Sequence, residues 1–514
     1  MKHNYLKAKL LNNFGWGAIL LVHLVVILLR LLYAVKAGVD LDPEEAQYWL
    51  WSKHPDWSYY SKPPLIAYIN GFTTGILGNY AWAVRLNAIL LGSLIGLLVY
   101  HITRDLYKRP KLAFVVSVGL LLLPGFHYIS LFFTTDVLAV LGWLLTTYLF
   151  WKAIKKDSFN SWALAGVFFG IGLLGKYTLL YFIPFSFLYL LFTNRRLLKK
   201  SGYYLFLFTG IFIFLPVIIW NLKHGMLGVL HVAHLAGAAN EFPGWNKVLA
   251  YQTEFFGGQL LLNLPLLCIL FFWKKYGLHE YLKGDFERYV LSGILFVVLS
   301  FTFLAFFKRI RINWLLFSYF PLYLILLKAI WQSGLFRRVK VYMSISFLLL
   351  VGLIIQPIFA TQRGKVIPVK VDPFSKLIGW QHLAEFIDRD IRKQTGNKDF
   401  VILSDKYQVA AQLSFYTPGQ PTTYCLPYSN RRMNQYDVWG IPEDLTNHNK
   451  PVAFVKDFPL EDDEEQHELI NSGNVVYNTT FSINYKGEKV KTYYIYLLEK
   501  MPVISKEQTL FVRY

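Results

Sequence analysis

The chain has 514 residues, of which 55% are hydrophobic, 18% aromatic and only 16% charged. Soluble domains carry about 25% charged residues, so this composition excludes a wholly soluble protein, and its hydrophobicity excludes a disordered one. The formal net charge of +20 is typical of nucleic-acid binding, but in so apolar a chain it indicates basic loops beside a membrane. We therefore expect membrane lipids and no nucleic acid as partners.

The excess positive charge is confined to one part of the chain. Residues 360–514 contain 19 basic and 19 acidic residues, whereas residues 1–359 contain 33 basic and 13 acidic residues. The basic part is also the apolar part. This distribution predicts a transmembrane domain over residues 1–359 and a soluble domain over residues 360–514, which is a normal size for one domain.

Apolar runs long enough to cross a bilayer recur along the first domain. A membrane-spanning helix needs about 20 mostly apolar residues. The sequence predicts about eleven such spans in chain order: 14–35, 80–103, 112–130, 134–152, 160–176, 178–193, 203–220, 255–273, 289–307, 313–331 and 340–359.

The loops between these runs are basic on alternate sides. By the positive-inside rule the basic loops are cytoplasmic, so the N-terminus is cytoplasmic and an odd number of spans places the soluble domain outside. The tail shows mixed helix and strand patterns, which predict an extracytoplasmic α/β domain. The expected helices cover 376–395 and 461–471, and the expected strands cover 400–404, 452–456, 474–484 and 490–498.

The first outer loop, residues 36–79, is rich in carboxylates and aromatic rings. Asp42 followed by Pro43 is typical of a helix start, and Glu44 and Glu45 then fall in the first turn, where the helix dipole favours acids. Helix capping explains these acids without catalysis. Carboxylates beside aromatic rings also suit sugar binding, although the same rings suit a membrane-interface belt. The rings in question are Tyr48, Trp49, Tyr59 and Tyr60.

Two charged residues stand beside predicted spans. Lys62 precedes two prolines and an apolar run, so it is either a snorkelling anchor or a contact for a phosphate. Asp136 begins the fourth span in a Thr-Thr-Asp motif. It is either a helix cap or a functional acid, and the cost of an acid at a membrane span favours function.

Three basic residues contradict the positive-inside pattern. Lys308, Arg309 and Arg311 occupy a very short outer loop, where topology alone predicts few cations. A bound phosphate explains them, because arginine suits its geometry, and the alternative is contact with anionic lipid headgroups. Lys176 follows a glycine-rich run but does not form a P-loop, because the spacing is wrong and no strand precedes it. The sequence identifies no certain cofactor and leaves a divalent metal possible.

Several segments resemble one family of membrane enzymes. The run Glu44–Ser52, the run Tyr59–Leu65 and the motif Thr134–Asp136 resemble the polytopic GT-C glycosyltransferases. The closest branch is the bacterial relatives of the protein O-mannosyltransferases and the lipid A aminoarabinose transferases. Further similar segments contain Asn221 with His224, Gln259, Asn313 with Trp314, 415–421 and 430–439.

The resemblance implies a GT-C-type fold and a transfer reaction. Such enzymes move a sugar from a polyprenyl-phosphate carrier to a lipid, glycan or protein acceptor, usually with inversion. They work on the outer face of the bacterial cytoplasmic membrane, which implies a periplasmic tail domain here. Two departures stand out: Glu44 replaces the usual Asp before Glu-Ala, and Ser61 replaces the Glu that often precedes the Lys-Pro-Pro motif in the aminoarabinose branch.

These observations predict a site. The general base is Glu44 or Asp42, with Glu45 in the same group, and Asp136 is a second acid that orients the acceptor or the sugar. Cations stabilise the departing phosphate. The competing hypothesis is a transporter or flippase of lipid-linked sugars, which needs no base. The predicted phosphate ligands are Lys62, Lys176, Lys308, Arg309 and Arg311, and the predicted substrate contacts are Tyr48, Trp49, Tyr59, Tyr60, Asn221, His224, Gln259, Asn313 and Trp314.

Overall fold

The computed structural model divides the chain into two compact units. The first comprises the described parts of 1–32, 62–66 and 85–353, and the second those of 33–61, 67–84 and 354–514. The predicted boundary after residue 359 remains a prediction, because the contacts also group the first outer loop with the tail. The structure describes residues 14–503 except 238–241, 264–265, 267–271, 338–339, 342–343, 346, 350, 353, 356–367, 429–430, 448–449 and 463.

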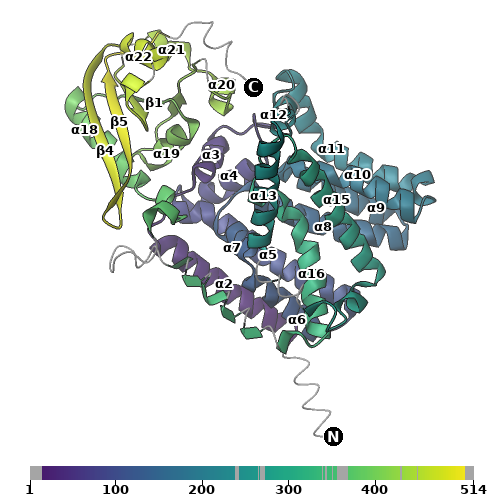
Figure 1. The fold of residues 1–514 in the computed structure, drawn as a ribbon. Coiled ribbons are helices and arrows are strands. Elements are labelled where there is room, and N and C mark those ends of the chain that lie inside the picture. The colour runs from purple at the N-terminus through teal and green to yellow at the C-terminus, as the bar shows by residue number, and fades with distance from the viewer. Residues whose placement is uncertain are drawn as a thin grey trace. The chain divides into compact units, whose positions relative to one another are not determined.

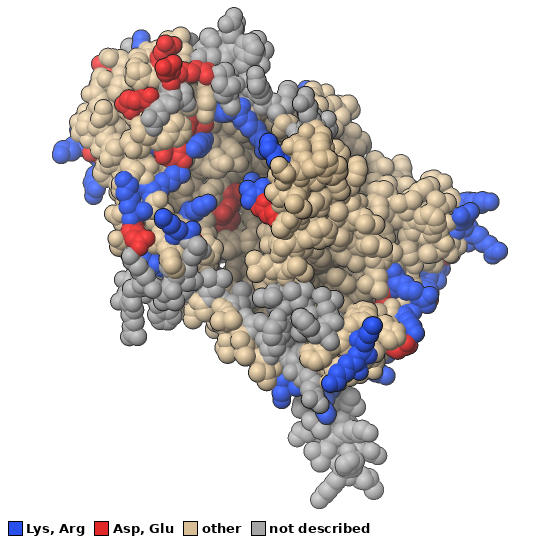
Figure 2. Space-filling model, in the orientation of Figure 1, with Lys and Arg blue, Asp and Glu red and all other residues tan. Residues whose placement is uncertain are grey.

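The first unit is a bundle of apolar helices (Figure 1). Within the described residues, six helices are long and apolar enough to cross a membrane. Many of their outward side chains are large and apolar, and uncharged surface separates the basic helix ends (Figure 2). The chain is therefore a multi-pass membrane protein. The six helices are α2 (Trp16–Lys36), α5 (Ala81–Tyr107), α8 (Thr135–Lys156), α11 (Ser201–Lys223), α15 (Asp285–Leu304) and the run Ile312–Gln332, formed by η5 (Ile312–Leu315) and α16 (Leu316–Gln332).

The predicted span 112–130 is not one straight helix. It consists of α6 (Pro110–Gly119), the short 3₁₀ turn η1 (Leu120–Leu122) and α7 (Pro124–Leu131), with a bend of 76°. Pro124 has no amide hydrogen and forces the preceding residue out of the helical region, and Leu123 is accordingly extended, with φ −103° and ψ 127°. The bend therefore follows directly from the position of this proline.

Shorter helices complete the first unit. They are α9 (Phe159–Gly175), η2 (Tyr177–Tyr181) with α10 (Phe182–Thr193), α12 (Leu227–Leu235) and α13 (Trp245–Leu262). The predicted spans 160–176 and 178–193 correspond to the first two of these segments. The predicted span 255–273 meets the end of α13, but most of its remainder and much of 340–359 lie outside the described residues. The count of eleven spans thus stays a prediction.

The second unit contains a five-stranded mixed sheet in the order β2-β1-β3-β5-β4. β2, β1 and β3 are parallel, and β5 runs antiparallel to both β3 and β4. This sheet confirms the predicted α/β tail. The strands are β1 (Val401–Ser404), β2 (Thr423–Cys425), β3 (Val452–Lys456), β4 (Val475–Tyr485) and β5 (Glu488–Leu498).

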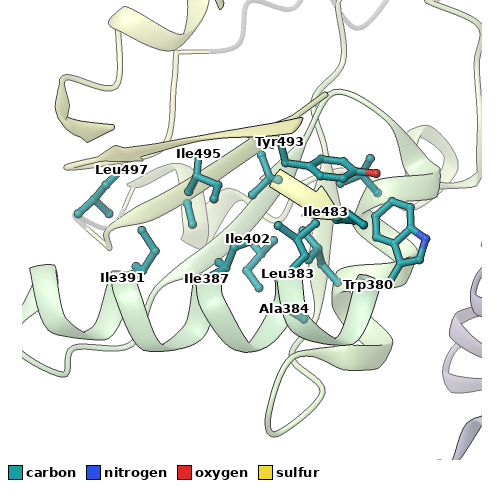
Figure 3. Close-up of a cluster of buried hydrophobic side chains, with 14 residues drawn as sticks. Trp380, Leu383, Ala384, Ile387, Ile391, Ile402, Ile483, Tyr493, Ile495 and Leu497 are labelled. Carbon is teal, nitrogen blue, oxygen red and sulfur yellow. The ribbon is translucent and has the colours of Figure 1, made fainter. Parts of the chain in front are cut away.

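Helices cover the sheet. Figure 3 shows α18 (Trp380–Thr395) lying along one face, with Leu383, Ile387 and Ile391 directed at the strands. Leu469 and Ile470 of α22 (Glu464–Asn471) belong to a separate apolar cluster with side chains of the sheet. Alternate strand residues face opposite sides, so one sheet supports both clusters.

Most of the first outer loop folds as part of this unit. It forms α3 (Pro43–Lys53) and most of α4 (Leu65–Leu77), and α3 packs on α19 (Tyr407–Tyr416). The edge of Trp49 meets the ring of Phe415 with centroids 4.8 Å apart. The sequence did not predict α19, β2, α20 (Gln435–Trp439) or α21 (Glu443–Asn447), which are all short.

Candidate active site

Three residues from distant parts of the first unit meet around one carboxylate. Lys176 Nζ lies 2.5 Å from Asp136 Oδ1, and Asn313 Nδ2 donates to Asp136 Oδ2 at 2.7 Å. The Asp136 and Lys176 side chains are only 6% and 12% exposed. Both carboxylate oxygens thus receive a donor in a nearly dry environment, where such contacts are strong. We call these three residues the Asp136 cluster.

The start of α8 fixes the position of Asp136. Thr134 is the N-cap of this helix, and its hydroxyl accepts from the Asp136 amide at 3.4 Å. Asp136 itself lies in the first turn, where the helix dipole favours a negative charge. The cap therefore belongs to Thr134, which leaves the Asp136 carboxylate directed at Lys176 and Asn313.

Close contact between two helices brings Lys176 to this carboxylate. A Cβ on Gly142 of α8 would lie 2.7 Å from the Cα of Gly172 in α9, and a Cβ on Gly175 would lie 2.8 Å from the Cβ of Leu138. Only glycine permits this approach. α9 ends at Gly175, and Lys176 adopts an extended conformation before η2. The glycine run before Lys176 thus serves helix packing.

Gln259 supports Asn313 from a third helix. Its amide nitrogen donates to the carbonyl of Ile312 at 3.3 Å, and its oxygen accepts from the Tyr319 hydroxyl at 2.9 Å. A Cβ on Gly258 would lie 3.2 Å from Ile312, so the neighbouring glycine lets α13 approach closely. Gln259 therefore positions the turn that carries Asn313. Tyr319, its buried partner, had no signal in the sequence.

The basic segment 308–311 leads directly into this turn. Lys308 Nζ lies 5.5 Å from the ring centroid of Trp314, which is a cation–π distance. Arg309 Nε donates to Glu254 at 2.7 Å, and both side chains of that pair are largely exposed. Arg311 is exposed two residues before Asn313. The structure thus places these cations beside the Asp136 cluster along the chain, with Arg309 engaged by an acid.

Asn221 and His224 stabilise the turn between α11 and α12. The Asn221 side-chain oxygen accepts from the amide of Gly228 at 2.9 Å, and its nitrogen donates to the Val217 carbonyl at 2.9 Å. His224 stacks on Trp220 with centroids 4.1 Å apart. Both side chains hold the local backbone in this structure, and their predicted contacts with substrate remain predictions.

Three neighbouring carboxylates of the first loop, Asp42, Glu44 and Glu45, have different surroundings in the second unit. Asp42 is the N-cap of α3 and accepts from the Glu44 amide at 2.8 Å, while Glu45 accepts from the Asp42 amide at 2.9 Å. This capping box confirms the predicted helix start. Glu44 is half-buried and accepts from the Tyr48 hydroxyl at 3.0 Å. Of these three acids, Glu44 is the one whose carboxylate accepts from no backbone amide of the described residues.

The aromatic rings of the loop pack within the second unit. The Trp49 indole donates to Asn79 at 3.0 Å, and Tyr59 stacks on Trp51 with centroids 4.5 Å apart. The Tyr60 amide donates to Gln435 at 2.6 Å. All of these rings are buried, so in this conformation they hold the loop to the tail.

Two predictions remain, the phosphate contact at Lys62 and a possible metal site. Lys62 is half-buried and is grouped with the first unit. Among the residues that the structure describes, no three His, Cys, Asp or Glu side chains gather as a metal site requires.

Comparison with protein families gives a match that lies mostly in the first unit. The family described as dolichyl-phosphate-mannose-protein mannosyltransferase matches residues 61–220, which contain Lys62, Asp136 and Lys176. The lipid A galacturonosyltransferase RgtD of Rhizobium johnstonii is 27% identical over 310 residues, or 58% of this chain and 63% of that protein. The chain thus matches less than two thirds of the length of this curated relative.

Two solved structures share the fold. They are crystal structures of ArnT from Cupriavidus metallidurans, one in the apo state and one bound to undecaprenyl phosphate. Each has a TM-score of 0.58, with 14% and 13% identity, and they cover 93% and 94% of this chain and 97% and 98% of theirs. The fold class predicted from the sequence is thereby confirmed, as is the resemblance to this group of proteins.

Proposed function

We propose that the protein is a glycosyltransferase that moves a sugar from a polyprenyl-phosphate donor to an acceptor on the outer face of the cytoplasmic membrane. One observation carries this proposal: a buried carboxylate, a lysine and an asparagine meet at one end of the apolar helices, directly after a basic segment. The relatives point the same way, since one is named a lipid A galacturonosyltransferase and another binds undecaprenyl phosphate.

The base in this reaction is Glu44. Among the described residues, its carboxylate accepts a hydrogen bond from a tyrosine hydroxyl alone, whereas Asp42 and Glu45 form the capping box. A carboxylate that withdraws the acceptor hydroxyl proton makes the oxygen a nucleophile. That oxygen attacks the anomeric carbon as the bond to the carrier phosphate breaks. Asp42 is the alternative base, because it is a carboxylate in the same loop, two residues before Glu44.

The phosphate is held by cations. An ammonium group has three donors, and Lys176 uses one on Asp136, which leaves two for a phosphate oxygen. Lys62, Lys308 and Arg311 add positive charge, and Arg309 joins them when it exchanges Glu254 for phosphate. Charge on the leaving phosphate grows in the transition state, so these contacts accelerate the reaction. Asp136 keeps Lys176 in place and orients the sugar with Asn313.

The acceptor we favour is a lipid A-type glycolipid. The relative named for lipid A supports this choice over a polysaccharide or a protein. The N-terminus then lies in the cytoplasm and the sheet domain in the periplasm. The sugar is best tested as a panel, since the match to the galacturonosyltransferase and the departure at Ser61 both favour sugars other than aminoarabinose.

The test is a transfer assay with purified full-length protein, lipid A and polyprenyl phosphates that carry different sugars. We expect one sugar to be transferred, and Lys308→Ala with Arg311→Ala to raise the donor KM at least about tenfold. The matched control, Lys274→Ala with Lys275→Ala, removes two exposed charges elsewhere in the same unit and should leave KM unchanged. Absence of transfer together with donor movement across vesicles would instead support a flippase.

A further inference from the structure

A cavity lies near the opposite end of α8 from Asp136. Residues of α8, α10 and α15 line this cavity, which has a volume of about 490 Å³. Lys155, which lines it, is 19 residues after Asp136 in the single helix α8, or about 28 Å along the axis. This length matches the hydrocarbon thickness of a bilayer, about 30 Å, so the cavity faces the other leaflet.

The wall of this cavity is aromatic and apolar. Trp151 and Phe185 are buried and line it from α8 and α10. On the same helix as Phe185, Leu188 is 37% exposed and Phe192 is 77% exposed. An exposed apolar surface of this kind on a membrane helix suits a hydrocarbon chain, because both surfaces are apolar.

The rim of the cavity carries two cations and one carboxylate. Lys155 Nζ lies 3.0 Å from Asp285 Oδ2, and an Arg288 nitrogen lies 3.7 Å from Asp285 Oδ1. Asp285 thus holds the two cations near one another, and the group keeps one net positive charge. Arg288 also donates through Nε to the Lys283 carbonyl at 2.9 Å, which leaves donors of its five-donor guanidinium for a ligand.

We infer that this cavity binds an anionic glycerophospholipid. The phosphate of the lipid bridges Lys155 and Arg288, and one acyl chain lies along Leu188 and Phe192. Basic pockets between transmembrane helices select anionic headgroups in this way. The site is independent of the proposed transfer reaction, because no residue of the Asp136 cluster lines it.

The experiment is native mass spectrometry of the full-length protein with phosphatidylglycerol or phosphatidylethanolamine that have identical acyl chains. We expect a clear preference for phosphatidylglycerol in the wild type. Lys155→Ala with Arg288→Ala should weaken phosphatidylglycerol about 30-fold and phosphatidylethanolamine much less, since each cation near a membrane surface contributes about one fivefold factor. Both side chains are more than half exposed, so their removal leaves the packing intact.

Two further variants separate the contributions. Phe192→Ala should weaken both lipids by a similar factor of about three, because it removes a chain contact and no charge. Lys274→Ala with Lys275→Ala removes the same charge outside the cavity and should change neither affinity. The inference fails if the Lys155 and Arg288 variant keeps the preference, if the control pair loses it equally, or if soluble glycerol phosphate displaces the lipid.

Discussion

In the described part of the first unit, two buried ion pairs look alike and lie at opposite ends of the bundle. Asp136 pairs with Lys176 and accepts from Asn313, while Glu287 pairs with Lys328 and accepts from the Tyr107 hydroxyl at 2.5 Å. Each joins three separate segments. They differ in where the lysine stands: Lys176 lies at a break between two helices, and Lys328 lies inside α16.

This difference indicates different roles. Lys328 lies inside a helix, its side chain is only 6% exposed, and it contacts both its carboxylate partner and a tyrosine ring. Lys176 is more exposed, at 12%, and a basic segment precedes its asparagine partner along the chain. Breaking a buried pair leaves an uncompensated charge in either case. Function therefore has to be assigned from what surrounds the pair, and the following variants test that assignment.

The largest effect is expected at the Asp136 cluster. Asp136→Asn keeps the shape of the side chain but removes the charge that holds Lys176. We expect kcat/KM for sugar transfer to fall about 1000-fold, which corresponds to about 4 kcal/mol. The measurement is the transfer assay on purified protein. Retention of activity within tenfold of wild type would make the Asp136 pair as structural as the Glu287 pair.

The matching change at the other end should act on stability. Glu287→Gln leaves Lys328 buried without its counter-charge, and such losses cost about 3 kcal/mol or more. We expect a lower unfolding temperature in detergent, with kcat/KM per folded molecule near that of the wild type. If Glu287→Gln impairs transfer as strongly as Asp136→Asn, the contrast between the two pairs is wrong.

The second unit contains a buried carboxylate, Asp405, that can be compared with the two paired acids of the first unit. Among the described residues Asp405 Oδ2 has no hydrogen-bond partner, and burial raises the pKa of this carboxyl from 3.8 to about 6. The folded state therefore binds more protons than the unfolded state between pH 4 and 6, and stability falls as pH rises through that window. This shift is worth about 3 kcal/mol above pH 6.

Asp405→Asn should recover most of that loss. We expect the variant to gain about 2 kcal/mol at pH 7.5 and to lose the pH dependence between 4 and 6. Thermal unfolding of the full-length chain at several pH values measures both. Asp399→Asn, at a side chain that is 92% exposed, is the control and should change neither. An unchanged pH profile in Asp405→Asn would show that burial does not penalise this acid.

The smallest effect on stability is expected in the first loop. Asp42→Ala removes the N-cap of α3 and should cost about 1 kcal/mol of stability. Asp42→Asn keeps a capping oxygen, so it should preserve both stability and transfer, whereas Glu44→Gln should lose transfer. If Asp42→Asn loses as much activity as Glu44→Gln, the base is Asp42 or the two acids act together.

Much of the fold was predictable, because long apolar runs and alternating strands leave strong patterns. The helix cap at Asp42 and the four longer strands of the tail followed from local rules. The bend at Pro124 was missed, since the hydrophobic run continues through it. The strand β2 and the helix α19 are short and largely buried, so they lack the periodicity that marks an exposed face.

The individual residues of the site were predictable, but their proximity was not. Asp136, Lys176 and Asn313 each stood out in the sequence, but their meeting depends on helix packing across 177 positions of chain. The aromatic residues of the first loop were expected to contact substrate, and their burial was not predictable. Trp49 and Tyr59 have the composition of a sugar platform, yet they pack inside the second unit. The sequence alone does not distinguish an aromatic residue that contacts a ligand from one that packs in a core.

The contact between Gly142 and Gly172 has a consequence for how the site tolerates change. Gly142 lies one and a half turns along α8 from Asp136, and Gly172 lies about one turn before Lys176. A single added methyl group at either position would push the two helices apart and lengthen the ion pair. Two residues without side chains therefore determine whether Lys176 reaches Asp136. They matter for the site although they have no reactive group.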